Sequence, residues 1–159
     1  MLILALPVAL AAATVRTPGP CDLLDRTAAT QLLGQPVTSL TPSGPEPDED
    51  TGGTRTVCVY QAGMRMLILT RVAFPTAAAA RAAMTAELVG ERLAEDGVTV
   101  KEESGLGDKA YWAQSANAAE YIVLKGPTAL GIALGATPQE QQSFHASLRS
   151  AAKAVTEKL

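Results

Sequence analysis

Few side chains in this sequence have the type and spacing that enzyme chemistry needs. The sole histidine, His145, has no Asp, Glu or Cys three or four residues away on the helix expected there. We therefore predict a surface histidine and no metal ligand or general base. With one histidine and two cysteines, neither a structural zinc site nor a Cys-His nucleophile pair can be assembled. No catalytic residue, metal ion or cofactor is expected.

The pair Gly105-Leu106-Gly107 raises the possibility of a phosphate-binding loop. Dinucleotide fingerprints have the order Gly-x-Gly-x-x-Gly and open a helix, whereas this pair precedes an expected strand at 109–113. We interpret it as a tight bend in which Asp108 hydrogen-bonds a nearby backbone N–H. The bend thus has a structural role in this interpretation.

The functional alternative for this bend is a small recognition patch. Aromatic side chains with polar tips are frequent in interface hot spots. The patch would consist of Asp108, Lys109, Tyr111 and Trp112. Core packing is the other role open to Trp112, the only tryptophan.

Carboxylates alone could also support catalysis. A glycan-active enzyme could use Asp108 with Glu120 or Glu103, if the two carboxyl groups converge in a pocket at roughly 5 to 10 Å. The acidic residues within 41–54 lack the alternation with glycine that Ca²⁺ loops need, so we expect a solvated, mobile surface loop. Such a loop could act in a sensor or inhibitor module by entering the cleft of another protein.

The start of the chain has the pattern of a secretory signal. Residues 1–13 are apolar, carry no charge and end in alanines, as the hydrophobic region and cleavage site of a signal do. They lack a positive segment, which indicates a true start upstream, and they are too short to span a bilayer core of ~30 Å. Residues 14–20 are expected to form an extended leader because Pro18 and Pro20 oppose regular structure.

The mature part, residues 21–159, is expected to form a single domain. Its two cysteines, Cys21 and Cys58, would form a disulfide in an oxidising compartment, and two buried thiols are the alternative. Lipidation of Cys21 is not expected, since Pro18-Gly19-Pro20 stand where a lipoprotein signal has small, flexible residues. The protein is therefore expected in the secreted or cell-envelope compartment.

Helix and strand signals alternate along the mature chain. The expected helices cover about 26–33, 76–96 and the segment from Pro138 onward. The expected strands cover 55–61, 64–73, 98–103, 109–113, 118–125 and 128–135. Both faces of the strand at 64–73 are apolar in the middle, which indicates a central strand covered on both sides. The strand at 128–135 has one face of small residues, and we expect the Ala-rich helix at 76–96 to pack there.

This order predicts an α+β fold, in which two or three helices pack on an antiparallel β-sheet in the order helix, strands, helix, strands, helix. The 159 residues are 47% hydrophobic and can bury one core. The net charge of −3 and the absence of basic runs argue against a nucleic-acid partner.

Three short motifs carry a family resemblance: Cys21-x-Leu23-Leu24 followed by Leu32-Leu33-Gly34, Cys58-Val59-Tyr60, and Gly105-Leu106-Gly107-Asp108-x-Ala110. Together they resemble the small exported lipoprotein-like domains of unknown function in actinobacteria, which are similar in outline to PsbP-like α/β/α sandwiches. The resemblance implies a non-catalytic envelope domain in which the first-helix cysteine is bridged to the Cys-x-Tyr strand. It supplies no catalytic residue.

The leading expectation is a non-catalytic secreted or envelope binding domain for an envelope or extracellular protein, lipid or glycan. The alternatives are the carboxylate-based hydrolase and the sensor or inhibitor module. The sequence contains no transmembrane span in its mature part.

Overall fold

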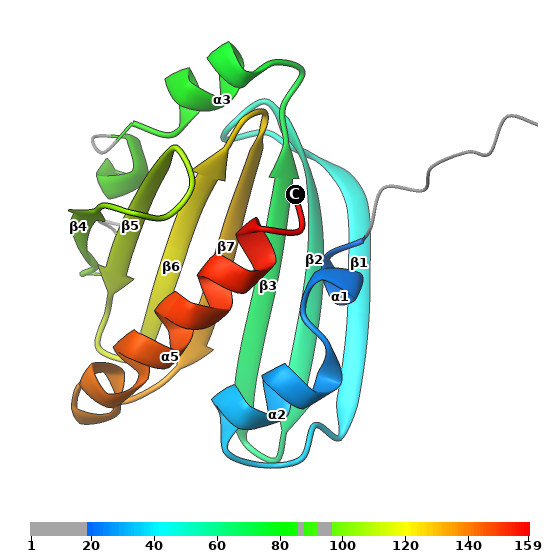
Figure 1. Ribbon diagram of the computed structural model, residues 1–159, viewed down its shortest axis with the longest axis vertical. Coiled ribbons are helices and arrows are strands. Elements are labelled where there is room, and N and C mark those ends of the chain that lie inside the picture. Colours follow the sequence, from blue (N-terminus) through cyan, green and yellow to red (C-terminus); the bar gives the residue numbers. More distant parts are fainter. Residues whose placement is uncertain (1–18, 86–87, 92–96) are drawn as a thin grey trace, which may run out of the picture.

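The computed structural model describes residues 19–85, 88–91 and 97–159 (Figure 1). The predicted signal at 1–13 and most of the predicted leader lie outside the described residues. No helix among the described residues is long and apolar enough to cross a membrane.

The described chain folds around one seven-stranded sheet, in which the strand order is β1-β2-β3-β7-β6-β5-β4 and every neighbouring pair is antiparallel. The strands are β1 (Ser39–Asp48), β2 (Gly53–Ala62), β3 (Arg65–Ala73), β4 (Thr99–Glu103), β5 (Lys109–Gln114), β6 (Ala118–Lys125) and β7 (Thr128–Gly135). The long-range pairing of β3 with β7 joins the two halves of the chain.

Helices cover the two faces of the sheet unequally. The short helices α1 (Pro20–Leu23) and α2 (Arg26–Leu33) and the long helix α5 (Pro138–Thr156) lie on one face, as Figure 1 shows. Helix α3 (Ala77–Ala83) packs on the other face, over β6 and β7. The predicted α+β class is confirmed.

The larger core lies between the sheet and α1, α2 and α5. Its fully buried side chains include Leu69, Tyr121, Ile132 and Leu148. Local signals define the helices here: the Asp25 carboxylate caps α2 by accepting from the backbone N–H of Ala28 at 2.8 Å. The predicted bounds of this helix are confirmed.

The disulfide prediction is confirmed as well. Cys21 in α1 is bonded to Cys58 in β2, across a Cα–Cα distance of 5.2 Å. The bond fixes a helix of only four residues to the core, because Cys58 is fully buried. Next to it, the hydroxyl of Tyr60 donates to the carbonyl of Leu24, and burial raises the pKa of Tyr60 to about 12.

The predicted mobile loop at 41–54 is wrong for most of its length. Residues 39–48 form β1, which pairs with β2, and only 49–52 form the turn between them. The three prolines of this segment are tolerated because β1 is an edge strand and bonds on one side only. The pairing register shifts between Ser43 and Glu46, where the Gly44–Pro45 peptide is cis.

The predicted continuous helix at 76–96 is also wrong. Thr76 caps α3 as expected, but the helix ends at Met84, whose carbonyl accepts a hydrogen bond from the Tyr111 hydroxyl at 2.8 Å. Thr85 then starts a new helical turn, since its hydroxyl accepts from the backbone N–H of Leu88. Residues 86–87 and 92–96 lie outside the described residues.

Because α3 is short, the face of the sheet beneath it stays partly open. On β3 the side of Leu67 and Leu69 is fully buried, whereas Met66 on the other side is 45% exposed. The prediction that this strand is covered on both sides is therefore wrong for its second face. Helix α3 packs over Ala129 of β7, as expected, but Ala133 further along the same strand stays only half-buried.

Candidate functional site

The four residues of the predicted recognition patch do not share one surface. Tyr111 and Trp112 are both buried, and they point to opposite faces of β5, as neighbours on a strand do. Trp112 belongs to the larger core, next to Tyr121 at 4.7 Å between ring centroids. Asp108 and Lys109 remain exposed at the start of the strand.

Asp108 closes the bend between β4 and β5. Its carboxylate accepts from the backbone N–H of Gly126 at 2.7 Å, and its own N–H donates to the carbonyl of Leu124 at 2.7 Å. These bonds attach the bend to the turn between β6 and β7. The interpretation of this segment as a structural turn is confirmed.

His145 does not stand alone, contrary to the prediction from its helical neighbours. Its Nε2 atom lies 2.9 Å from Oε1 of Glu103 and 2.7 Å from the hydroxyl of Tyr121. The Tyr121 hydroxyl donates to Oε2 of Glu103 at 2.8 Å, and the Arg149 guanidinium donates to the same oxygen. We call these four residues the Glu103 cluster.

The hydrogen-bond pattern indicates which ring nitrogen of His145 carries a proton. A carboxylate accepts only, and the Tyr121 hydroxyl already donates to Glu103, so Nε2 must carry the proton that both contacts share. Burial alone would raise the pKa of Glu103, but the hydrogen bonds from His145 and Tyr121 and the nearby positive charge hold it below its ordinary value. Burial, together with the bond to Glu103, raises the pKa of Tyr121 to about 12.

The Glu103 cluster links three elements of the fold. Glu103 comes from β4, Tyr121 from β6, and both His145 and Arg149 from α5. Tyr121 is fully buried, and each polar atom named above is bonded within the cluster. This arrangement suits a clamp that attaches the C-terminal helix to the short edge strand β4.

A Glu103→Gln variant is expected to lose about 2 kcal/mol of unfolding free energy at pH 7, because a charge-assisted acceptor for Arg149 and His145 is removed. The folded-state pKa of Glu103 is lowered, so this stabilisation is present above the unfolded pKa and is lost as the pH falls through the folded one. Urea unfolding at pH 7 and pH 3 measures both effects.

Glu102→Gln is the matched control, since Glu102 is the exposed neighbour on the same strand. The clamp interpretation would be contradicted if the two variants were equally stable at pH 7. A deficit of Glu103→Gln that persisted unchanged at pH 3 would show that the lost stability does not come from the carboxylate charge.

The carboxylates proposed for a hydrolase are spread over the fold. Glu103 and Glu120 lie on opposite faces of the sheet. Glu103 pairs with Ala110 of β5, which faces the larger core and α5, whereas Glu120 pairs with Ala113 of β5. Ala110 and Ala113 are three positions apart on one strand, so their side chains point to opposite faces. Asp108 and Glu103 both line the cavity inside the bend at 102–109, where each carboxylate is already hydrogen-bonded. Asp108 and Glu120 share no cavity among the described residues.

Glu120 instead lines two cavities on the α3 side of the sheet. One cavity of about 210 Å³ extends from α3 along the sheet, and the other, of about 320 Å³, lies beside the turn between β5 and β6. We call them together the α3-face groove. Glu120 lines both cavities, and the residues that line one of them include Asp48, Asp50, Arg55, Val72, Met84, Val89, Ala113, Ile122, Ala129 and Ala133.

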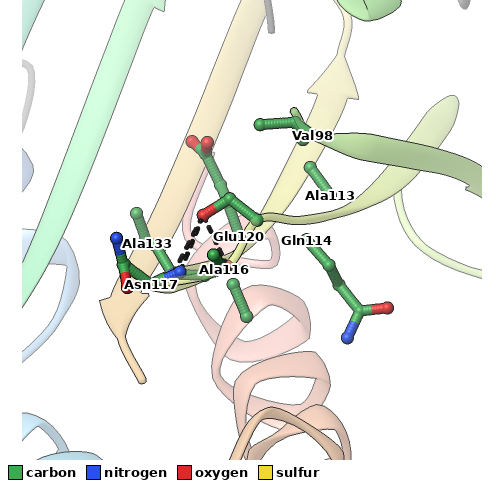
Figure 2. Close-up of a pocket in the computed structure, with 10 residues that line it drawn as sticks. Val98, Ala113, Gln114, Ala116, Asn117, Glu120 and Ala133 are labelled. Carbon is green, nitrogen blue, oxygen red and sulfur yellow. Dashed lines mark hydrogen bonds between the residues drawn. The ribbon is translucent and has the colours of Figure 1, made fainter. Parts of the chain in front are cut away.

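The second cavity is bounded by a hydrogen-bonded turn at 115–118. The hydroxyl of Ser115 accepts from the backbone N–H groups of Asn117 and Ala118, at 3.3 and 3.1 Å (Figure 2). The buried side chain of Gln141 on α5 donates to the Ser115 carbonyl at 2.8 Å. Figure 2 shows the Glu120 carboxylate pointing away from this turn.

The position of Glu120 depends on a glycine. A Cβ atom on Gly131 of β7 would lie 2.3 Å from Oε1 of Glu120, so the missing side chain leaves the space in which the carboxylate lies. No hydrogen bond or ion pair joins Glu120 to another side chain of the described residues. Burial raises the pKa of Glu120 to about 7.

Sequence reasoning considered Glu120 only as half of a catalytic pair. The available signal was Gly131 inside a strand, since such a glycine often marks the close approach of another group. From the sequence, this glycine was used only to predict that the Ala-rich helix at 76–96 packs closely on the strand at 128–135. Among the described residues, no three His, Cys, Asp or Glu side chains gather to hold a metal ion.

Comparisons with known proteins give a likeness in fold. No protein-family model matches the chain, and no curated protein matches its sequence. Among solved structures, the fold is similar to the extracellular domain of PknH from Mycobacterium tuberculosis, with a TM-score of 0.52 and 14% sequence identity over 86% of this chain and 92% of that chain. In fold, the chain is therefore similar to an extracellular domain of an actinobacterial protein.

Proposed function

We propose that this protein is a non-catalytic binding domain of the secreted or cell-envelope compartment, and that the α3-face groove is its ligand site. The observation that carries the proposal is the groove itself, in which apolar walls surround one half-buried carboxylate without a protein partner. Ligand sites are typically concave and mostly apolar, with a few polar groups that orient the ligand.

Two further observations support the proposed compartment. The Cys21–Cys58 disulfide is typical of proteins in oxidising compartments. The structural neighbour is an extracellular domain. Both agree with the secretory-signal pattern at 1–13, and together they support an extracytoplasmic protein.

The non-catalytic part of the proposal rests on the state of the candidate carboxylates. Glu103 is engaged in its cluster, Asp108 closes a backbone turn, and Glu120 stands on the other face. Of these three carboxylates, only Glu120 has no hydrogen bond or ion pair to a described residue, so the pairs considered from the sequence do not form. Insertion of a loop at 41–54 into the cleft of another protein loses its basis, because 41–48 belong to β1. The likeness in fold to the extracellular domain of PknH still agrees with a sensor module.

The groove is tested with Nile red, an uncharged dye that fluoresces when it enters an apolar site. The wild-type domain is expected to bind the dye, and Ala133→Phe is expected to weaken binding at least fivefold, because the larger ring fills the cavity beside Glu120. Ala146→Phe is the matched control, since Ala146 is exposed on α5, on the other side of the sheet.

Two results would overturn the proposal. Equal dye binding by wild type and Ala133→Phe would show that the groove is not the site. Hydrolysis of an envelope glycan by the wild-type domain, abolished by Glu103→Gln or Asp108→Asn, would show that the protein is an enzyme.

A further inference from the structure

We propose that the α3-face groove binds a small aliphatic ligand that carries a protonated amine, and that the Glu120 carboxylate receives this amine. The inference deepens the proposed function and rests on it, since it names the ligand class of the same site. It is carried by the charges at the groove, the character of its walls and its size.

The charged groups of the groove favour a cation. Asp48, Asp50 and Glu120 line the cavity next to α3, and Arg55 is the only basic residue among the lining residues described. Arg55 is already neutralised, because its guanidinium bonds the Glu46 carboxylate at 2.8 Å. A bound cation would therefore find a carboxylate without a competing partner, whereas an anion would be repelled.

The remaining groups on this face do not change the balance. Lys109 on β5 and Glu102 on β4 point to the same face, but both lie outside the two cavities. The Tyr111 hydroxyl is occupied by the carbonyl of Met84. Glu120 is thus the ionisable residue that lines both cavities.

The lining and the volume of the two cavities indicate the character and size of the ligand apart from its amine. Apolar side chains line both cavities beside Glu120. They come from the residue after α3, from the following helical turn and from four strands: Val72, Met84, Val89, Ala113, Ile122 and Ala129. Cavities of about 210 and 320 Å³ fit a small molecule and not a folded partner. An alkyl chain ending in an ammonium group matches both the walls and the carboxylate.

The protonation of the Glu120 carboxyl group makes binding of the amine dependent on pH. The pKa of the free carboxyl group is about 7, so about one tenth of the groups are ionised at pH 6 and about nine tenths at pH 8. An alkylammonium ion stays protonated over this range, since amines of the lysine type have pKa values of about 10. The affinity for the amine is therefore expected to rise about tenfold from pH 6 to pH 8.

Isothermal titration calorimetry of the mature domain with n-octylammonium and n-octanol tests the inference. The two probes share a chain length and differ in charge. At pH 8 the wild-type domain is expected to bind octylammonium at least tenfold more tightly than octanol, and the preference is expected to shrink at pH 6. Glu120→Gln should remove the preference and its pH dependence while octanol binding is kept.

Glu157→Gln is the matched control, because it removes one negative charge from the exposed end of α5. It should leave the preference intact. Circular dichroism and urea unfolding of each variant confirm that it is folded.

The possible failures can be told apart. If octanol and octylammonium bind equally well, or if Glu120→Gln keeps the preference for the amine, the amine inference is wrong while the groove remains a binding site. If neither probe binds and Nile red does not bind either, the proposed function fails with it.

Discussion

A Cys21→Ala/Cys58→Ala double variant is expected to lose about 3 to 4 kcal/mol of unfolding free energy relative to the oxidised wild type. The two cysteines are separated by 37 positions, so the disulfide removes much of the freedom of the unfolded chain in this segment. Besides the disulfide, burial of Leu23 and the hydrogen bond from Lys158 to the Leu23 carbonyl attach the four-residue helix α1. Urea unfolding under oxidising conditions measures it.

The control is a reductant, added to both proteins. Wild type with dithiothreitol should approach the stability of the double variant, whereas the double variant itself should not respond. A deficit below 1 kcal/mol would show that packing of Leu23 and Leu24 alone holds the N-terminal helices in place. The disulfide would then have little effect on stability.

Gly107→Ala is expected to cost about 3 kcal/mol or more, and the variant should unfold at a clearly lower urea concentration. A Cβ atom on Gly107 would lie 2.3 Å from the carbonyl oxygen of Leu124, which is fixed by its bond to the Asp108 N–H. The backbone φ of +55° adds strain for any residue with a side chain. Neither the Leu124 carbonyl nor the bend can move away from the added Cβ atom without breaking the hydrogen bond between the Asp108 N–H and the Leu124 carbonyl.

Gly105→Ala is the matched control within the same bend. Its φ is +80°, but the nearest atom to an added Cβ is a flexible Arg149 nitrogen at 3.5 Å. Only the conformational strain of about 1 to 2 kcal/mol is expected there. Equal costs for the two substitutions would show that the contact with Leu124 is not what requires glycine at 107.

Local signals in the sequence predicted most elements of this fold. A cap at Asp25, a stop at Gly34 and a proline at the start of the last helix act over a single turn, and the structure confirms all three. The strand hairpins were equally predictable, because the alternation of side chains along a strand and the glycines of the turns are also local features of the sequence. The placement of β7 between β3 and β6 is not a local property and was not predicted.

The candidate sites were harder to predict because their members meet only in three dimensions. Glu103 and His145 are 42 residues apart, so inspection of helical neighbours could not find the cluster. Met84, which follows the last residue of α3, accepts a hydrogen bond from Tyr111, 27 residues further along the chain. Glu120 likewise lines one cavity with Asp48 and Val89, which are distant from it in the sequence.

The edge strand β1 has a consequence for association with other chains. Three of its ten residues are prolines, which provide no backbone N–H. A free sheet edge normally recruits another strand through regular N–H and C=O pairing, whether in a complex formed by strand addition or in a growing fibril. The prolines and the irregular step after Ser43 interrupt that pairing, so this edge is expected to resist the addition of another strand when the protein is concentrated.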